Sequence, residues 1–217
     1  MTGSRIMLAL ATLVSAATAA GAQAKPAAAA APAGIQHWVV APVGNEGRYI
    51  VRETLFNHDF PNDAIGKVSD ISGDLFVDPT GKVVGTDSKI VINVSKMSSD
   101  QPRRDKILRA QSIESDKFPT VTLVPKSFVG LTAKPGSAPQ DFDFLADLTV
   151  HGTTRPTTWK VTAHTQGPDI VGTAKTAFTF ADFSLQKPKT AMVNMGLGVQ
   201  DTIRLEYDFH FTQKQTP

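Results

Sequence analysis

Apolar and polar residues alternate along two segments of the chain. Between residues 141 and 150, apolar residues occupy the alternate positions Phe142, Phe144, Ala146, Leu148 and Val150, and Leu145 is the one apolar residue among the positions between them. Between residues 202 and 211, they are Ile203, Leu205, Tyr207, Phe209 and Phe211. A period of two places one face of an antiparallel strand on a core and the other face in water. Both segments are therefore predicted to be half-buried strands.

Further strands are predicted where β-branched and aromatic residues are frequent. Turn sequences separate these segments, among them residues 78–81 (Asp-Pro-Thr-Gly) and 151–152 (His-Gly). The segments are residues 36–41, 49–56, 67–78, 88–95, 120–129, 157–164 and 170–180. A chain of about eight strands at this spacing is typical of an all-β sandwich or barrel.

One helix is predicted, in residues 102–113. Ile107, Leu108 and Ile113 have roughly helical spacing among charged residues, and Pro119 closes the segment. A single helix among strands usually covers the open end of a barrel or the flank of a sheet, and closure into a barrel removes exposed edges. We therefore expect an all-β fold, a single antiparallel β-barrel of about eight strands with one short helix near the barrel end.

The N-terminus has the pattern of a cleavable signal peptide. Arg5 precedes an apolar run, and small residues lead to Ala22-Gln23-Ala24. A membrane anchor is the alternative, but the apolar run is shorter than the ~20 residues that a spanning helix needs. We predict a signal peptide in residues 1–24, an Ala/Pro-rich linker in residues 25–35 and one domain in residues 36–213.

Charge and composition narrow the possible chemistry. The formal net charge is +2, and no basic cluster is longer than Arg103-Arg104, which argues against a nucleic-acid partner. The chain has no cysteine, which excludes thiolate, iron–sulfur and Cys-ligated zinc chemistry. Its five histidines have no metal-ligand spacing. We therefore predict neither a metal site nor catalytic residues.

Four pieces of the sequence, in order, resemble the YceI-like family. They are residues 78–84, residues 99–105 leading to 113–119, residues 147–159 with an LTxHGxT hairpin, and residues 178–183 with 201–206. The resemblance covers almost everything after the linker. One departure is Ile107, which stands where many members have histidine. Ligand preference is therefore not transferred from other branches of the family.

The resemblance implies a lipocalin-like barrel with an elongated hydrophobic channel. In this family the channel holds a long-chain amphiphile such as a polyisoprenoid, an isoprenoid quinone or a fatty-acid derivative. The implied protein is exported to the periplasm, does not span the membrane, performs no chemical step and needs no cofactor. Family barrels often pair, which leaves a homodimer open. Burial of a hydrocarbon chain would gain about 0.8 kcal/mol per CH₂.

The candidate ligand contacts are inward-facing side chains of the predicted strands. They are Phe142, Phe144, Leu148, Trp159, Phe178, Phe180, Leu205, Tyr207 and Phe209. The alternative is that these side chains only pack against each other, because alternation does not separate a filled core from a channel. Tyr207 and Trp159 stand out because each carries a polar atom that needs a partner when buried.

Three polar residues are candidates for binding a ligand headgroup at the barrel mouth: Arg103, Arg104 and His58. An arginine offers a planar fork that suits phosphate or carboxylate. The alternative for the arginines is an ion pair at the helix start, where Asp105 lies in the first turn. For His151, a tight turn favours a ring hydrogen-bonded to backbone over a base or a metal ligand.

Two other functions stay open on the sequence. One is an enzyme that acts on a lipid or quinone in the same pocket, for which Glu53 is the candidate acid because it shares the parity of Val51 and Leu55. The other is a non-ligand interaction module whose barrel is filled by its own side chains.

Overall fold

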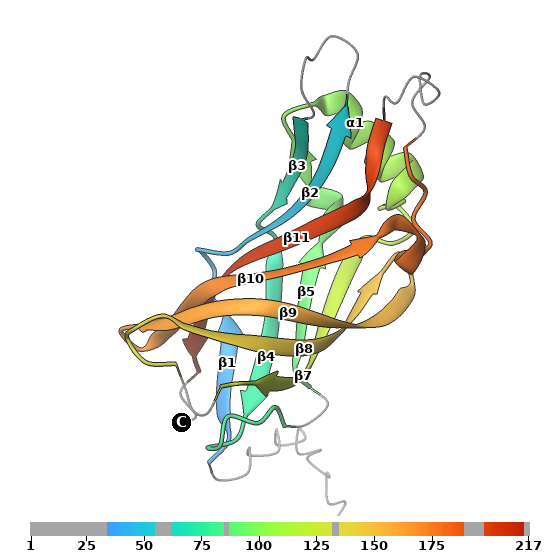
Figure 1. Ribbon diagram of the computed structural model, residues 1–217. Helices are drawn as coiled ribbons and strands as arrows, with labels where there is room; N and C mark the ends of the chain where they lie inside the picture. Colours follow the sequence, from blue (N-terminus) through green and yellow to red (C-terminus); the bar gives the residue numbers. More distant parts are fainter. Residues whose placement is uncertain (1–33, 55–61, 85–86, 132–134, 189–197, 215–217) are drawn as a thin grey trace, which may run out of the picture. The chain divides into compact units, whose positions relative to one another are not determined.

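The computed structural model describes residues 34–54, 62–84, 87–131, 135–188 and 198–214, all within one compact unit, Pro32–Pro217 (Figure 1). The predicted signal peptide, most of the predicted linker, and His58 lie outside the described residues. The strands are β1 (Gln36–Val40), β2 (Glu46–Thr54), β3 (Asn62–Val68), β4 (Ile71–Val77), β5 (Lys89–Asn93), β6 (Ser98–Ser99), β7 (Thr120–Val129), β8 (Gln140–Val150), β9 (Thr153–Gln166), β10 (Asp169–Thr179) and β11 (Gly198–Gln213).

Eight strands form a closed antiparallel barrel, which confirms the predicted fold class. The order around the ring is β1-β4-β5-β7-β8-β9-β10-β11, and pairing of β1 with β11 closes it. β2 pairs with the N-terminal part of β11, β3 pairs with β2, and β6 pairs with β3. One short α-helix in the described residues, α1 (Pro102–Ile107), runs on into a π-helical turn, Leu108–Ser112, close to the end of β2 and the start of β3 (Figure 1).

The β8–β9 hairpin shows why the alternating sequence forms strands. His151 and Gly152 make the two-residue turn with positive φ angles of 49° and 73°, and Val150 pairs with Thr153 across it. This backbone matches the twist of the flanking strands. Along β8, Phe144, Ala146, Leu148 and Val150 are all buried. The apolar face of the pattern is therefore the inside of the barrel.

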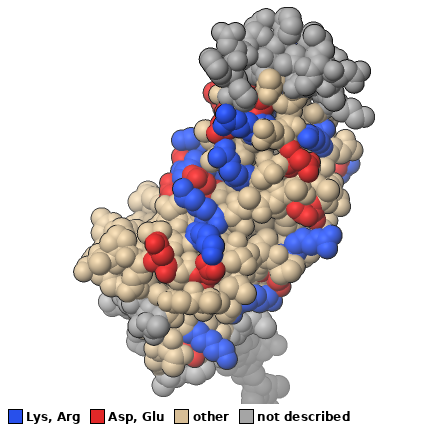
Figure 2. Space-filling view, viewed as in Figure 1, with Lys and Arg blue, Asp and Glu red and all other residues tan. Residues whose placement is uncertain are grey.

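The outer face of the barrel carries charges of both signs. Arg48 on β2 contacts Glu46 at 2.8 Å, Asp208 at 2.6 Å and Glu206 at 3.3 Å. The hydrogen bond from Arg48 holds the pKa of Asp208 below its usual range. Lys and Arg lie beside Asp and Glu over the face shown in Figure 2. On that face the described residues form no large patch of one sign.

Residues 67–78 form two strands, whereas the sequence pattern predicted one. The chain breaks after β3 at residues 69–70 and begins β4 at Ile71. β3 pairs with β2, whereas β4 pairs with β1 and β5. Asp70 fixes the break, because its carbonyl accepts from the Asn93 amide at 2.9 Å and its carboxylate from the Asn93 side chain at 2.8 Å. Ser69 and Asp70 stand between buried Val68 and buried Ile71 and interrupt the period of two, a signal that the prediction of one strand overlooked.

Closure of the barrel requires β11 to change partner along its length. It pairs with β2 up to Asp208 and with β1 from Phe211. Buried Asn45 bridges the change: its side-chain oxygen accepts from the His210 amide at 3.0 Å and from the Tyr207 hydroxyl at 2.9 Å. Its amide nitrogen donates to the Ala41 carbonyl at 2.8 Å. One side chain therefore joins the two pairing regions.

We predict that Asn45→Ala lowers the free energy of unfolding by about 2–4 kcal/mol, because it leaves several buried polar groups without partners. Urea denaturation of the full domain measures this loss. The matched control is Asn62→Ala, at an exposed position on β3, which should change stability by less than about 0.5 kcal/mol. Equal effects of the two substitutions would contradict the role of Asn45.

Candidate functional site

Two apolar cavities lie inside the barrel. Cavity 1 lies among the side chains of Trp38, Phe128, Phe142, Phe144, Phe209 and Phe211, and cavity 2 lies among those of Tyr49, Leu148, Trp159, Phe178, Phe180 and Leu205. The space between the atoms is about 990 Å³ in cavity 1 and about 980 Å³ in cavity 2, open mouths included. Leu123 and Tyr207 line both. The cavities therefore meet at these two residues.

The strands build both cavities from successive inward positions. On β8, the residues near its start, Phe142 and Phe144, line cavity 1, whereas Leu148 and Val150 line cavity 2. On β11 the order is reversed: Leu205, earlier in the strand, lines cavity 2, and Phe209, later in the strand, lines cavity 1. Side chains at every second residue of a strand share a face. The two cavities therefore follow each other along the barrel.

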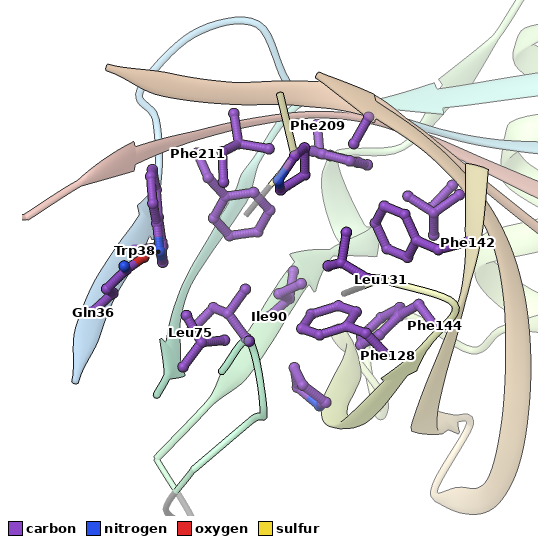
Figure 3. A pocket seen from close by; sticks show the side chains of 18 of the residues that line it. Gln36, Trp38, Leu75, Ile90, Phe128, Leu131, Phe142, Phe144, Phe209 and Phe211 are labelled. Carbon is purple, nitrogen blue, oxygen red and sulfur yellow. Dashed lines mark hydrogen bonds between the residues drawn. The ribbon is translucent and has the colours of Figure 1, made fainter. Parts of the chain in front are cut away.

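Aromatic rings dominate cavity 1 (Figure 3). Phe128 stacks on Phe144 with ring centroids 5.3 Å apart and meets the edge of Phe142 at 5.7 Å. Phe209 and Phe211 enter from another wall and lie across the space from these rings. Polar groups are few, and those of Gln36 and Asp78 belong to residues at strand ends. Cavity 1 is therefore suited to an apolar chain.

Cavity 2 extends to the helical segment. Leu108 and Ile113 line it, and the Ser112 hydroxyl donates to the Gln186 carbonyl at 2.7 Å. The Tyr49 ring lies on Gly66, where an added Cβ would sit 2.0 Å from a ring carbon, so only glycine fits beneath it. Burial raises the pKa of Tyr49. The wall at this end is thus fixed by close packing of a ring on backbone.

All nine residues proposed from the sequence as ligand contacts line the interior. Phe142, Phe144 and Phe209 line cavity 1, and Tyr207 lines both cavities. The other five line cavity 2: Leu148, Trp159, Phe178, Phe180 and Leu205. The Trp159 indole donates to the Thr157 hydroxyl at 3.0 Å, so the tryptophan has the partner that its buried polar atom needs.

Several lining residues were missed, and their sequence signals differ. Phe211 continues the alternation of β11 and could have been included. Phe128 could not be placed by parity, because β7 has a register shift between Pro125 and Ser127. A bulge of this kind turns the following residues over to the other face. Trp38 lies in the short strand β1, whose five residues give little periodic signal.

The two arginines proposed for a headgroup occupy different environments. Arg104 contacts the Glu53 carboxylate at 2.7 Å and also pairs with Asp100, and its side chain is 16% exposed. Arg103 is exposed. Neither arginine is among the residues that line the cavities, and Glu53 is not among them either. Arg104 therefore neutralises a buried carboxylate, and both groups are already engaged.

His151 has a different partner from the one predicted. Its Nε2 lies 2.8 Å from the Glu114 carboxylate rather than at a backbone group, and its ring packs on Phe118 with centroids 4.3 Å apart.

The described residues contain no group of three His, Cys, Asp or Glu side chains placed to hold a metal ion. In the same part of the chain, no helix has the length and apolar character needed to cross a membrane.

Comparison with known proteins gives matches at both sequence and structure level. The family model of the YceI-like domain matches residues 45–211. Two UPF0312 proteins, from Pseudomonas putida strains GB-1 and W619, are each 24% identical over 164 residues, covering 72% of this chain and 82% of the relative.

Solved structures with the same fold include three proteins of low sequence identity. A polyisoprenoid-binding domain from Saccharophagus degradans has a TM-score of 0.62 at 13% identity, covering 82% of this chain and 98% of that one. BcnA of Burkholderia cenocepacia has a TM-score of 0.59 at 12% identity, covering 79% and 98%. The YceI protein of Campylobacter jejuni has a TM-score of 0.57 at 14% identity, covering 75% and 92%.

We predict that Arg104→Met lowers the free energy of unfolding by about 3 kcal/mol, because Glu53 is left as a buried charge without its cation. The neighbouring exposed residue provides the control, and Arg103→Met should cost less than about 0.5 kcal/mol. Both values come from urea denaturation at neutral pH. A small loss at Arg104, equal to that at Arg103, would show that the pair is not structural.

Proposed function

The chain belongs to the YceI-like family, and from this premise we propose that it is a lipid-binding protein that holds a long-chain amphiphile in its barrel. The ligand class is a polyisoprenoid, an isoprenoid quinone or a fatty-acid derivative. The proposed role is sequestration and carriage in the periplasm, with no chemical step. Export rests on the signal-peptide pattern of residues 1–24.

The observation that carries this proposal is the apolar interior of the closed barrel. Every strand of the eight-membered ring contributes at least one lining side chain to cavity 1, and nearly all of these side chains are hydrocarbon. Each CH₂ group that leaves water for such a space gains about 0.8 kcal/mol. A long chain therefore needs few polar contacts to bind. The polyisoprenoid-binding domain of Saccharophagus degradans, which has the same fold, supports an isoprenoid as the first ligand to test.

The two alternatives have less support. An enzyme would need a titratable group beside the ligand, but Glu53, its candidate acid, is paired with Arg104 and lines neither cavity. An interaction module with a filled barrel would need rings that meet across the axis, but the interior leaves two cavities. Binding without chemistry is therefore the function that the interior favours.

Extraction of natively purified protein with organic solvent, followed by mass spectrometry, should identify the bound chain. We expect a long-chain lipid in near-stoichiometric amount, and the heat-denatured, washed protein serves as the control. A clean extract, together with no uptake of a fluorescent fatty acid or of an isoprenoid quinone, would refute the proposed function.

We further predict that Ile170→Trp weakens binding of a fluorescent fatty acid about tenfold or more, because the larger ring fills part of cavity 1 and displaces buried CH₂ groups. Val129→Trp is the matched control, since Val129 is 54% exposed and lines neither cavity. Fluorescence titration measures both dissociation constants. Equal affinity of the two variants would place the bound chain outside cavity 1.

A further inference from the structure

The junction between the two cavities is the starting point for an inference that rests on the proposed function. We propose that Tyr207 is a gate that sets the length of apolar chain the barrel accepts. Tyr207 belongs to the lining of both cavities, so an apolar chain that fills one cavity reaches this side chain before it enters the other. A longer chain has to displace this ring before it can occupy both cavities.

Tyr207 lies midway along the inward face of β11. Ile203 and Leu205 precede it in cavity 2, and Phe209 and Phe211 follow it in cavity 1. Four residues of strand separate Tyr207 from either end of this series, or roughly 13 Å along the strand in each direction. Tyr207 therefore lies between two parts of the interior of similar depth, cavity 1 and cavity 2, which we call the two chambers.

One small residue pairs with Tyr207, and another lies on β8 between the residues that line the two cavities. Ala174 is its direct partner on β10, and Ala146 on β8 falls between Phe144 of cavity 1 and Leu148 of cavity 2. Ala146 is 2% exposed and Ala174 is 5% exposed, so both belong to the core. Alanine supplies little volume, and Leu123 is the other described residue that lines both cavities, so we expect removal of the tyrosine ring to widen the junction.

A buried hydrogen bond fixes the gate. The Tyr207 hydroxyl donates to the side-chain oxygen of Asn45 at 2.9 Å, and the Asn45 amide is itself held by the Ala41 carbonyl at 2.8 Å. Asn45 also joins β11 to the β1–β2 connection through the His210 amide. Displacing the ring breaks this bond and leaves a buried hydroxyl without a partner. A long chain that passes the gate therefore binds with a free-energy penalty, the loss of this hydrogen bond.

The test compares saturated fatty acids from octanoic to octadecanoic acid on the full protein, by displacement of a fluorescent fatty acid. For the wild type we expect affinity to rise about fourfold per buried CH₂ and then to stop rising once one chamber is filled. In Tyr207→Ala the rise should continue, with octadecanoic acid bound about tenfold more tightly than by the wild type.

Two further variants separate the gate from a general effect on the cavity. Tyr207→Phe keeps the ring but loses the bond to Asn45, and should bind octadecanoic acid about threefold more tightly than the wild type. Phe209→Ala removes a neighbouring ring that lines cavity 1 alone, and should leave unchanged the chain length at which affinity stops rising. Thermal unfolding shows which variants fold, and Tyr207→Phe provides the test if Tyr207→Ala does not.

The outcomes distinguish the gate from the proposed function. A length limit that moves in the Tyr207 variants but not in Phe209→Ala supports the gate. Wild-type affinity that rises steadily over the whole series, or a limit that no Tyr207 variant moves, overturns the gate and leaves lipid binding in place. No binding of any fatty acid by the wild type counts against the proposed function, and the gate falls with it.

Discussion

The barrel depends on the closure that β11 makes with two partners. A sheet that ended at β11 would expose a row of unpaired backbone groups, and its apolar face would open to water. Instead β11 pairs with β2 along one part and with β1 along another. The buried side chain of Asn45 satisfies the backbone between these parts. The same asparagine holds Tyr207, so closure of the wall and the shape of the interior share one hydrogen-bonded group.

Because the barrel is closed, alternate residues of each strand face either its interior or its outer surface. Inward positions carry rings and aliphatic chains, whereas ion pairs such as Lys160 with Asp143 lie on the outer face. Arg104 is an instructive exception, because it is mostly buried and yet lines neither cavity. Its charge is matched by Glu53 and Asp100 within the wall. Cavity 2 therefore stays mostly apolar at the end where the helix lies, with Arg48 and Glu206 as the charged residues in its lining.

The inward side chains of this barrel pack against each other and also leave space between them. Tyr207 and Leu123 line both cavities, and the other inward rings each line only one of them. Small buried residues such as Ala146 and Ala174 contribute to this, because alanine supplies little volume between the larger side chains of the core. The balance of large and small residues at each level thus decides how far a guest chain can enter.

The strands, their inward faces and the single helix followed from the sequence, because a period of two and turn residues are local properties of the chain. The inward position of eight of the nine proposed contacts followed for the same reason, since parity along a strand fixes the face on which a side chain lies; the ninth, Phe180, lies in a 3-10 helical turn, Phe180–Phe183. Local pattern did not place Phe128, whose parity is reversed by the bulge in β7, or the break between β3 and β4.

Only the tertiary structure decided which distant groups meet. It paired Arg104 with Glu53, His151 with Glu114 and Tyr207 with Asn45. It also decided that the interior contains two cavities rather than a filled core. The physical reason is that such contacts depend on the register and closure of the whole ring. No periodicity along a single strand records how far apart opposite walls stand, or which side chains reach across between them.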